Sequence, residues 1–385
     1  MKTYIVRLIL KHMIPASVMM VIIAVASVSL AAESQSTADV NTAWSSSWKL
    51  GLGTESWQSE NSRTDLVAFS GLLKTDKVWN DFLDFTSEVM LKTRSGQREG
   101  TNENGVTPQS LYIFEASLGI GKAKALQARL GALNPHAIHS PILLEGLAIP
   151  GGRLTQAFPS EHQTFSIYTE AYAPQSHQVR AAGGEKGSFP AFFAGGVNQK
   201  YKWSNRFDSS WRAGAFQFQG LNTSVQNTST LLGNTSTPGP TNDLALLKYD
   251  YVGFEVGQTH NFLIAPKFLG TISADFIKNQ EAPEGQNSAY RGEFDLTSVV
   301  MPKYHLVTEV EAFRIEPDAV LAAFSNSDYF GANRNGYRIG ISLLMKKEKL
   351  KVTGSMIESQ TIVERPPQVK EQFYFLKMST TYEKL

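Results

Sequence analysis

Apolar and polar side chains alternate along much of the chain, most clearly between residues 288 and 315. Within 288–300, every second residue is apolar or small, and the residues between them are polar or charged from 291 to 297, which is the period-two pattern of a β-strand. Met301 and Pro302 interrupt the pattern, because proline has no N–H for a ladder hydrogen bond, and the alternation resumes over 303–315. The stretch therefore predicts a hairpin.

This hairpin has two properties of a membrane-spanning barrel. Its strands are longer than the usual five or six residues and approach the roughly 9–11 that a tilted strand needs to cross a bilayer. Its polar face is charged, and folding about the central turn is expected to place Arg291 opposite Glu311 and Glu293 opposite Glu309. If the apolar face contacts lipid, the charged face must line water.

The same alternation recurs from residue 46 to residue 382 and predicts sixteen strands, with fourteen or eighteen left open because one segment, 177–184, alternates only weakly. In this count every even-to-odd connection is short and most odd-to-even connections are longer, as in transmembrane barrels. The strands are predicted at residues 46–55, 65–74, 82–93, 111–121, 123–133, 163–173, 177–184, 190–202, 206–219, 245–258, 267–278, 288–300, 303–315, 336–346, 349–362 and 372–382.

Two all-β folds fit these strands: an antiparallel transmembrane β-barrel, and a secreted or periplasmic sandwich or solenoid. A sandwich usually has shorter strands and turns its polar face outward. Soluble β proteins also have no reason to sort their loops by length, so the alternation of connections favours the barrel. Beyond the N-terminal segment, no apolar run approaches the length of a membrane helix. A chain of this kind can span a membrane only as a closed barrel.

The N-terminal residues 1–31 are typical of a signal peptide. A basic head precedes an apolar stretch at 13–30, and small residues precede a cleavage site after residue 31 or 32. The alternative is a retained membrane anchor, because the apolar stretch is just long enough to span. The polar residues that follow at once favour removal. The mature chain then consists of a periplasmic lead-in at 32–45 and a barrel at 46–385.

Charge and cysteine content restrict the partners of the mature chain. Without Lys2, Arg7 and Lys11, 33 basic residues stand against 35 acidic residues. This balance argues against nucleic acid as a partner and against a polybasic membrane patch. The chain has no cysteine. An exported protein without disulfides must hold its fold by hydrogen bonds and packing alone.

The sequence carries no signature of catalysis, and we expect no enzyme activity, no metal and no cofactor. A nucleophile elbow, a His-Glu-x-x-His motif and a dinucleotide-binding loop are all missing. His136 and His139 are three residues apart, but no third metal ligand is evident, so we interpret them as ordinary loop histidines. Three Asn-Thr-Ser glycosylation acceptors lie within 221–244, a low-complexity segment that we interpret as flexible polar filler.

The last predicted strand resembles the terminal strand of Gram-negative outer-membrane proteins, in which alternating residues lead to an aromatic near the C-terminus. Here Glu383-Lys384-Leu385 follow that aromatic. The resemblance implies that the barrel insertion machinery is a partner. The mature chain also resembles general porins in length, hairpin count and loop alternation, which implies an outer-membrane location, contact with membrane lipid and a homotrimer. The alternating residues are Tyr374, Leu376, Met378, Thr380 and Tyr382.

In general porins the third outer loop folds into the lumen and narrows it, and residues 134–162 are the third outer connection in our count. The run 142–149 is too apolar for a solvated loop, and we expect it against the inner wall. The alternatives are a loop over the mouth, or one that contacts a neighbouring subunit. By this resemblance, a constriction is expected to contain Ile142, Leu143, Leu144, Glu145 and Arg153.

Charged residues of both signs occur at inward positions of the predicted strands. Their numbers nearly cancel, so we expect a weak overall ion preference. The candidate lumen-lining charges are Lys124, Arg129, Arg212, Arg291, Glu293, Asp295, Glu309, Glu311 and Arg338.

The leading hypothesis from the sequence is a porin for passive diffusion of small hydrophilic solutes and ions, since a barrel of sixteen strands is wide enough for an aqueous channel. A second hypothesis is a substrate-selective transporter in which 142–149 guides a hydrophobic molecule. A third is a non-conducting adhesin or receptor that binds through 221–244.

Overall fold

The computed structural model describes residues 44–60, 62–80, 82–99, 110–121, 125–174, 189–238, 245–364 and 368–384. The predicted signal peptide lies outside the described residues, as does nearly all of the predicted lead-in, and both stay predictions. Among the described residues, no helix combines the length and apolar character needed to cross a membrane.

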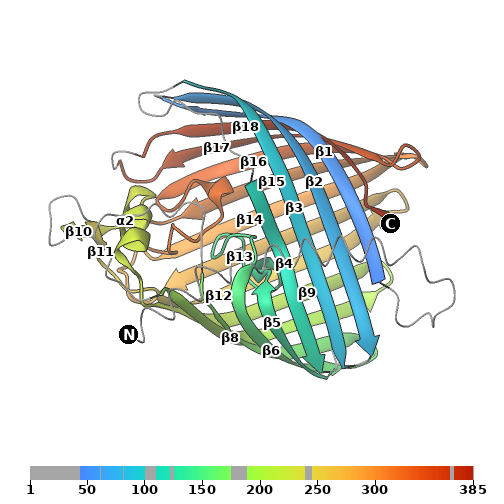
Figure 1. The fold of residues 1–385 in the computed structure, drawn as a ribbon, viewed down its shortest axis with the longest axis horizontal. Coiled ribbons are helices and arrows are strands. Elements are labelled where there is room, and N and C mark those ends of the chain that lie inside the picture. Colours follow the sequence, from blue (N-terminus) through green and yellow to red (C-terminus); the bar gives the residue numbers. More distant parts are fainter. Residues whose placement is uncertain are drawn as a thin grey trace, which may run out of the picture. The chain divides into compact units, whose positions relative to one another are not determined.

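Sixteen antiparallel strands form one closed barrel (Figure 1). β1 pairs with both β2 and β18, and β9 pairs with β12, so the described barrel has no free sheet edge. A two-residue strand, β19 (Glu383–Lys384), adds a second short pairing to β1. The barrel strands are β1 (Trp44–Ser59), β2 (Arg63–Asn80), β3 (Leu83–Glu99), β4 (Ser110–Gly121), β5 (Leu126–Leu133), β6 (Ile149–Pro159), β7 (Gln163–Tyr172), β8 (Ala191–Ser204), β9 (Phe207–Gln219), β12 (Val252–Ala265), β13 (Phe268–Asn279), β14 (Ser288–Met301), β15 (Tyr304–Ile315), β16 (Arg334–Met345), β17 (Leu350–Thr361) and β18 (Glu371–Thr380).

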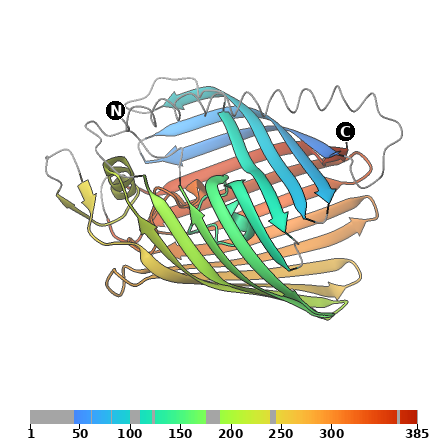
Figure 2. The ribbon, with the colours of Figure 1, turned by 60° about the horizontal axis from the view of Figure 1, so that its bottom comes forward.

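Long and short connections alternate around the barrel, as the sequence predicts. Three of the long ones, residues 134–148, 220–251 and 316–333, contain structure of their own and follow strands that run toward the same end of the barrel (Figures 1 and 2). Their elements are the short 3-10 helix η1 (Pro135–Ala137), the helix α2 (Thr223–Leu231), the two-stranded sheet of β10 (Ser236–Pro238) and β11 (Ala245–Leu247), and the 3-10 helix η2 (Ser327–Tyr329).

The two faces of the barrel wall differ as the alternation predicts. The outer face exposes large apolar side chains on nearly every strand, while charged side chains occupy the inward positions between them. A soluble sandwich would bury its apolar face instead, so the exposed apolar belt identifies the face that meets lipid. Exposed members of this belt include Val67, Phe69, Leu91, Leu130, Ile167, Trp211, Ile272, Phe294, Val310, Ile341 and Leu376.

The predicted count of sixteen is confirmed, but one strand of the barrel was missed and one predicted strand has no place in it. Residues 149–159 are not part of a loop, because they form β6 between β5 and β7. The weak strand predicted at 177–184 lies outside the described residues. β7 pairs directly with β8, so the barrel has no place for a strand between them.

Two further boundaries differ from the predictions. The strand predicted at 245–258 is divided, because 245–247 pairs with β10 and the barrel strand begins only at Val252. In the β14–β15 hairpin the register is shifted by two residues from the predicted one, so Glu293 lies opposite Glu311. The cause is a bulge between Val299 and Met301 together with a turn centred one residue later than predicted.

Candidate functional site

Arg291 on β14 is the centre of a charged network on the inner wall. Its Nε lies 2.8 Å from Glu311 Oε2 on β15, and its Nη1 lies 3.1 Å from Asp275 Oδ2 on β13. The same guanidinium also pairs with Glu293, and Arg212 on β9 pairs with Asp275. Asp275 and Glu311 are nearly buried, and the arginines compensate the charge of these carboxylates.

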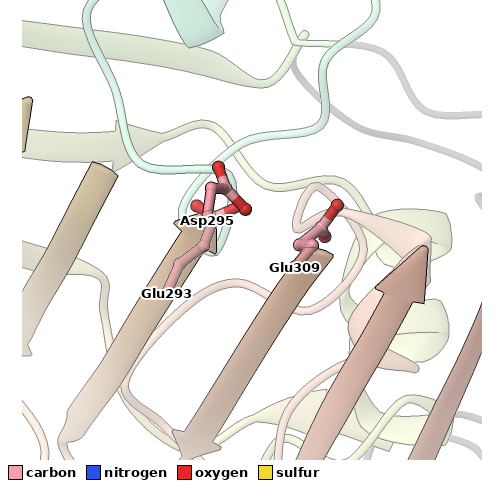
Figure 3. A group of neighbouring side chains, drawn as sticks. All are labelled: Glu293, Asp295 and Glu309. Atoms are coloured by element: carbon pink, nitrogen blue, oxygen red, sulfur yellow. The ribbon is translucent and has the colours of Figure 1, made fainter. Parts of the chain in front are cut away.

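Three carboxylates, Glu293, Asp295 and Glu309, lie next to this network on the same face of β14 and β15 (Figure 3). The observed register places Asp295 directly opposite Glu309, and one oxygen from each of the three lies within 4.8 Å of the others. Arg291 pairs with Glu293, and Arg338 Nη1 lies 3.3 Å from Glu309 Oε1. Since guanidinium groups already compensate two of the three carboxylates, we assign no metal centre here.

A second charged group lies on β3, β4 and β5. Arg129 Nη2 donates to Asp84 Oδ1 at 2.6 Å, and its Nη1 donates to Ser117 Oγ at 3.0 Å. Gln127 Nε2 donates to the other oxygen of Asp84 at 2.8 Å. Glu115, also on β4, accepts a 2.6 Å hydrogen bond from the backbone N–H of Asn134, where the 134–148 connection begins.

The 134–148 connection enters the barrel at this point and ends in contact with the wall. Asn134 caps η1 by accepting from the His136 backbone N–H, and the His136 ring is 2.8 Å from the Leu144 carbonyl oxygen. Burial lowers the pKa of His136, which therefore serves as a neutral ring within the loop.

His139 fixes the middle of this connection to two strands. Its ring is fully buried, with Nδ1 facing Glu255 on β12 and Nε2 facing Glu170 on β7. The backbone N–H of Ser140 also donates to Glu255, at 3.0 Å. Both ring nitrogens can donate only when the imidazole is protonated. Burial alone opposes that charge, but the two carboxylates, Glu255 foremost, raise the pKa of His139 to about 9.

The free energy of unfolding is expected to decrease as the pH rises through about 9, because His139 then loses its proton. The folded-state pKa of His139 lies above the ordinary 6.5. The stabilisation that the protonated ring provides is therefore complete below about pH 6.5 and is lost above about pH 9. The shift corresponds to roughly 3 kcal/mol at most. Urea titrations of the lipid-reconstituted barrel at pH 6 and pH 10 measure this decrease in unfolding free energy. A His139→Gln variant should not show the decrease, and an equal decrease in that variant would contradict the assignment to His139.

The apolar part of the connection belongs to a hydrophobic cluster at the end of the barrel where the long connections lie. Ile142, Leu143 and Leu144 are completely buried there. Backbone hydrogen bonds join this segment to the 316–333 connection, including Glu145 N to Phe324 O at 2.7 Å. We call this set the outer cluster; it includes Leu133, Ile142, Leu143, Leu144, Phe192, Phe216, Phe218, Val225, Tyr251, Ile315, Leu321, Phe324 and Phe330.

The 220–251 connection packs into the same cluster and is not the flexible filler expected from its composition. Asn222 accepts from the Val225 N–H and so caps α2, whose Val225 is buried. Asn234 is also buried and donates to the carbonyl oxygens of Pro317 and Val320. The signal that could have revealed α2 is an asparagine cap directly before a short run without glycine or proline.

The predicted constriction residues do not all lie on one loop. Glu145 is buried on the 134–148 connection, whereas Arg153 lies on β6, where its Nε is 2.7 Å from Glu170 Oε2. The role of these residues in a constriction stays a prediction. Of the predicted lumen-lining charges, Lys124 lies outside the described residues. The others project from inward positions of their strands, at Arg129, Arg212, Arg291, Glu293, Asp295, Glu309, Glu311 and Arg338.

The sequence did not reveal two features of this interior. The first is the contact of His139 with Glu170 and Glu255, which lie 31 and 116 residues away along the chain. The second is the participation of the 316–333 connection, in which Arg338 reaches Asp328 at 2.8 Å across the lumen side of β16. No local pattern marks either feature.

No family model matches this chain, and no curated protein matches it by sequence. Solved structures do resemble it. The "High pH structure of Pseudomonas putida OprB" has a TM-score of 0.55 at 11% identity, covering 88% of this chain and 94% of that one. The outer-membrane channel DcaP of Acinetobacter baumannii has a TM-score of 0.50 at 10% identity, covering 87% and 97%.

Salmonella typhi OmpF, solved in complex with daunomycin, has a TM-score of 0.51 at 10% identity and covers 88% of this chain and 98% of that one. At such low identity these likenesses establish the fold alone. The fold is that of the outer-membrane porins, a closed antiparallel barrel of sixteen strands.

Proposed function

We propose that this protein is an outer-membrane channel through which small hydrophilic solutes and ions diffuse passively. The observation that supports this proposal is the charged inner wall of a closed barrel. Arg291, Arg338, Arg129 and Lys377 project inward from strands whose outward residues are apolar. Charged side chains at such positions need water or partners, so they favour an aqueous lumen over a dry interior.

The narrowest part of the channel is proposed to lie beside the 134–148 connection. Its fixation by His139 and by the outer cluster leaves it little freedom to move away from the wall. The acidic group Glu293, Asp295 and Glu309 then lines the passage that remains. Cleavage of residues 1–31, proposed from their sequence pattern, completes the proposal. So do insertion through the terminal strand β18, by its resemblance to outer-membrane proteins, and assembly into a homotrimer, by the resemblance to porins.

A substrate-selective channel for a polar solute is the second candidate. It is favoured by the outer cluster, since three connections packed against one another narrow the end of the barrel where they meet. A hydrophobic substrate is not favoured, because the apolar run that was expected to guide it is buried in that cluster. Adhesion through 221–244 is not favoured either, since α2 places Val225 in the same cluster and is not free.

Reconstitution of the purified chain distinguishes these candidates. Planar-bilayer recordings are expected to show stepwise, steady conductance, and proteoliposome swelling is expected to slow gradually as the size of the sugar increases. Swelling with one solute class only would replace the general channel by the selective one. Silence in both assays, with the barrel shown to be folded by its heat-modifiable gel mobility, would refute conduction.

A further inference from the structure

Five inward positions on adjacent strands form a row across the inner wall where the first and last strands meet. The observed register joins Lys351 on β17 to Ser379 on β18, Ser379 to Gly51 on β1, Gly51 to Ser70 on β2, and Ser70 to Lys92 on β3. The two ends of the row are lysines, and the three positions between them are small. The row is thus a shallow floor with two hydroxyl groups and a positive charge at each side.

Two more lysines lie above and below this floor. Lys377 is the next inward position on β18, and its stem crosses Gly51, where an added Cβ would lie 3.0 Å from Lys377 Cε. Lys49 is the next inward position on β1, where Lys377 and Lys351 repel its charge and Glu88 attracts it. A hollow of about 60 Å³ is bordered by Gly51, Ser70, Lys92 and Lys377, and by Glu55, which pairs with Lys92. Glycine at position 51 therefore makes room for the lysine stem.

The charge of this lysine cluster is compensated far less than charge elsewhere on the inner wall. Arg291, Arg338 and Arg129 each pair with at least one carboxylate, as described above. In the cluster, Glu55 pairs with Lys92 and also with Arg94. Within the described part of the chain, no carboxylate lies within the 4.0 Å ion-pair distance of the remaining three, which are Lys49, Lys351 and Lys377.

We propose that Lys49, Lys92, Lys351 and Lys377 form a binding site in the lumen for a small oxyanion with two or more negative charges, with Ser70 and Ser379 beneath it. The inference rests on the proposed channel function. Four ammonium groups around one hollow attract a dianion more than chloride, because the attraction scales with the product of the charges. Ammonium groups on flexible stems attract as point charges without the rigid fork of arginine, which suits a solute that must also leave. All four lysines are partly exposed, so a solute can reach them.

The test uses sulfate and inorganic phosphate as probes in planar bilayers containing the full chain, at constant ionic strength and pH 7.5. Chloride conductance is expected to decrease with increasing sulfate or phosphate and to reach a plateau. Lys377→Gln should raise the half-inhibitory concentration of sulfate or phosphate about tenfold, because the site loses one nearby charge in partly aqueous surroundings. Lys351→Gln is the second variant and should also raise the half-inhibitory concentration. It keeps the test available if Lys377→Gln does not fold.

The matched control is Lys200→Gln, which removes an exposed lysine from the far wall, on β8. It should leave the inhibition unchanged. Equal inhibition in wild type, Lys377→Gln and Lys351→Gln, or no saturation in the wild type, would overturn the site. Calorimetric titration of the detergent-solubilised barrel with sulfate separates this inference from the channel itself. Lysine-dependent sulfate binding by a barrel that is silent in bilayers would support the site and refute conduction. Conduction without lysine-dependent sulfate binding would support the channel and refute the site.

Discussion

Replacing His139 with alanine should release the 134–148 connection from the barrel wall and cost about 3–5 kcal/mol of unfolding free energy, the usual cost of breaking a buried ion pair. Among the described residues, Glu255 would keep the hydrogen bond from the Ser140 N–H, although its side chain is almost completely buried. Glu170 would still pair with Arg153 and Tyr172. Urea titration in lipid measures the loss, and bilayer recordings should show a larger, noisier conductance.

The matched control for this experiment is His162→Ala. His162 lies in the turn between β6 and β7 with its side chain largely exposed, and its nearest carboxylate, on Glu161, is 3.9 Å away. Its replacement should change neither the unfolding free energy nor the conductance. Unchanged conductance in His139→Ala, together with unchanged stability, would show that His139 does not hold the connection in place.

Replacing Arg291 with methionine is expected to destabilise the barrel by a similar amount, about 3–5 kcal/mol, and to shift its ion preference toward cations. The substitution removes the cation shared by Asp275, Glu293 and Glu311, while Asp275 keeps Arg212. The buried Glu311 and the half-buried Glu293 would then lack their guanidinium partner and would attract cations from the lumen. Reversal potentials in asymmetric KCl measure the shift, and urea titration measures the stability.

Arg314→Met provides the comparison on the neighbouring strand. Arg314 is about half exposed on β15, and its contact with Glu316 is 3.7 Å long. Exposed pairs of this kind contribute little, roughly 0–1 kcal/mol, so neither stability nor reversal potential should change noticeably. If Arg291→Met shifted the reversal potential no more than Arg314→Met, the Arg291 network would not face the conducting path.

The strand that the sequence did not reveal, β6, shows where alternation ceases to be informative. Its sequence begins with Ile149 and Pro150, continues with two glycines and ends in Pro159. Glycine and proline have no place in an alternation of apolar and polar side chains. Gly151 is required for packing, since an added Cβ would lie 2.5 Å from the Tyr172 ring. The residue types that fit β6 to β7 are therefore the ones that hide it as a strand.

The β14–β15 hairpin shows a second kind of information that alternation lacks. A shift of two residues keeps every side chain on the same face of the sheet. Both registers therefore satisfy the sequence pattern equally well, and the bulge near Val299 and the position of the turn decide between them. The consequence is chemical, because the observed register brings Asp295 and Glu309 together, whereas the predicted one would have paired Glu293 with Glu309.

The sequence by itself determined which face of each strand meets lipid and which meets water, because neighbouring residues on a strand point to opposite sides whatever their partners are. Only the tertiary structure decided which charges meet. Lys49 and Lys377 lie near opposite ends of the chain and come onto one part of the inner wall because β1 pairs with β18. His139 meets Glu170 and Glu255 because its connection turns inward. Closure of the barrel and the path of a loop are long-range properties, and no periodicity along the chain encodes them.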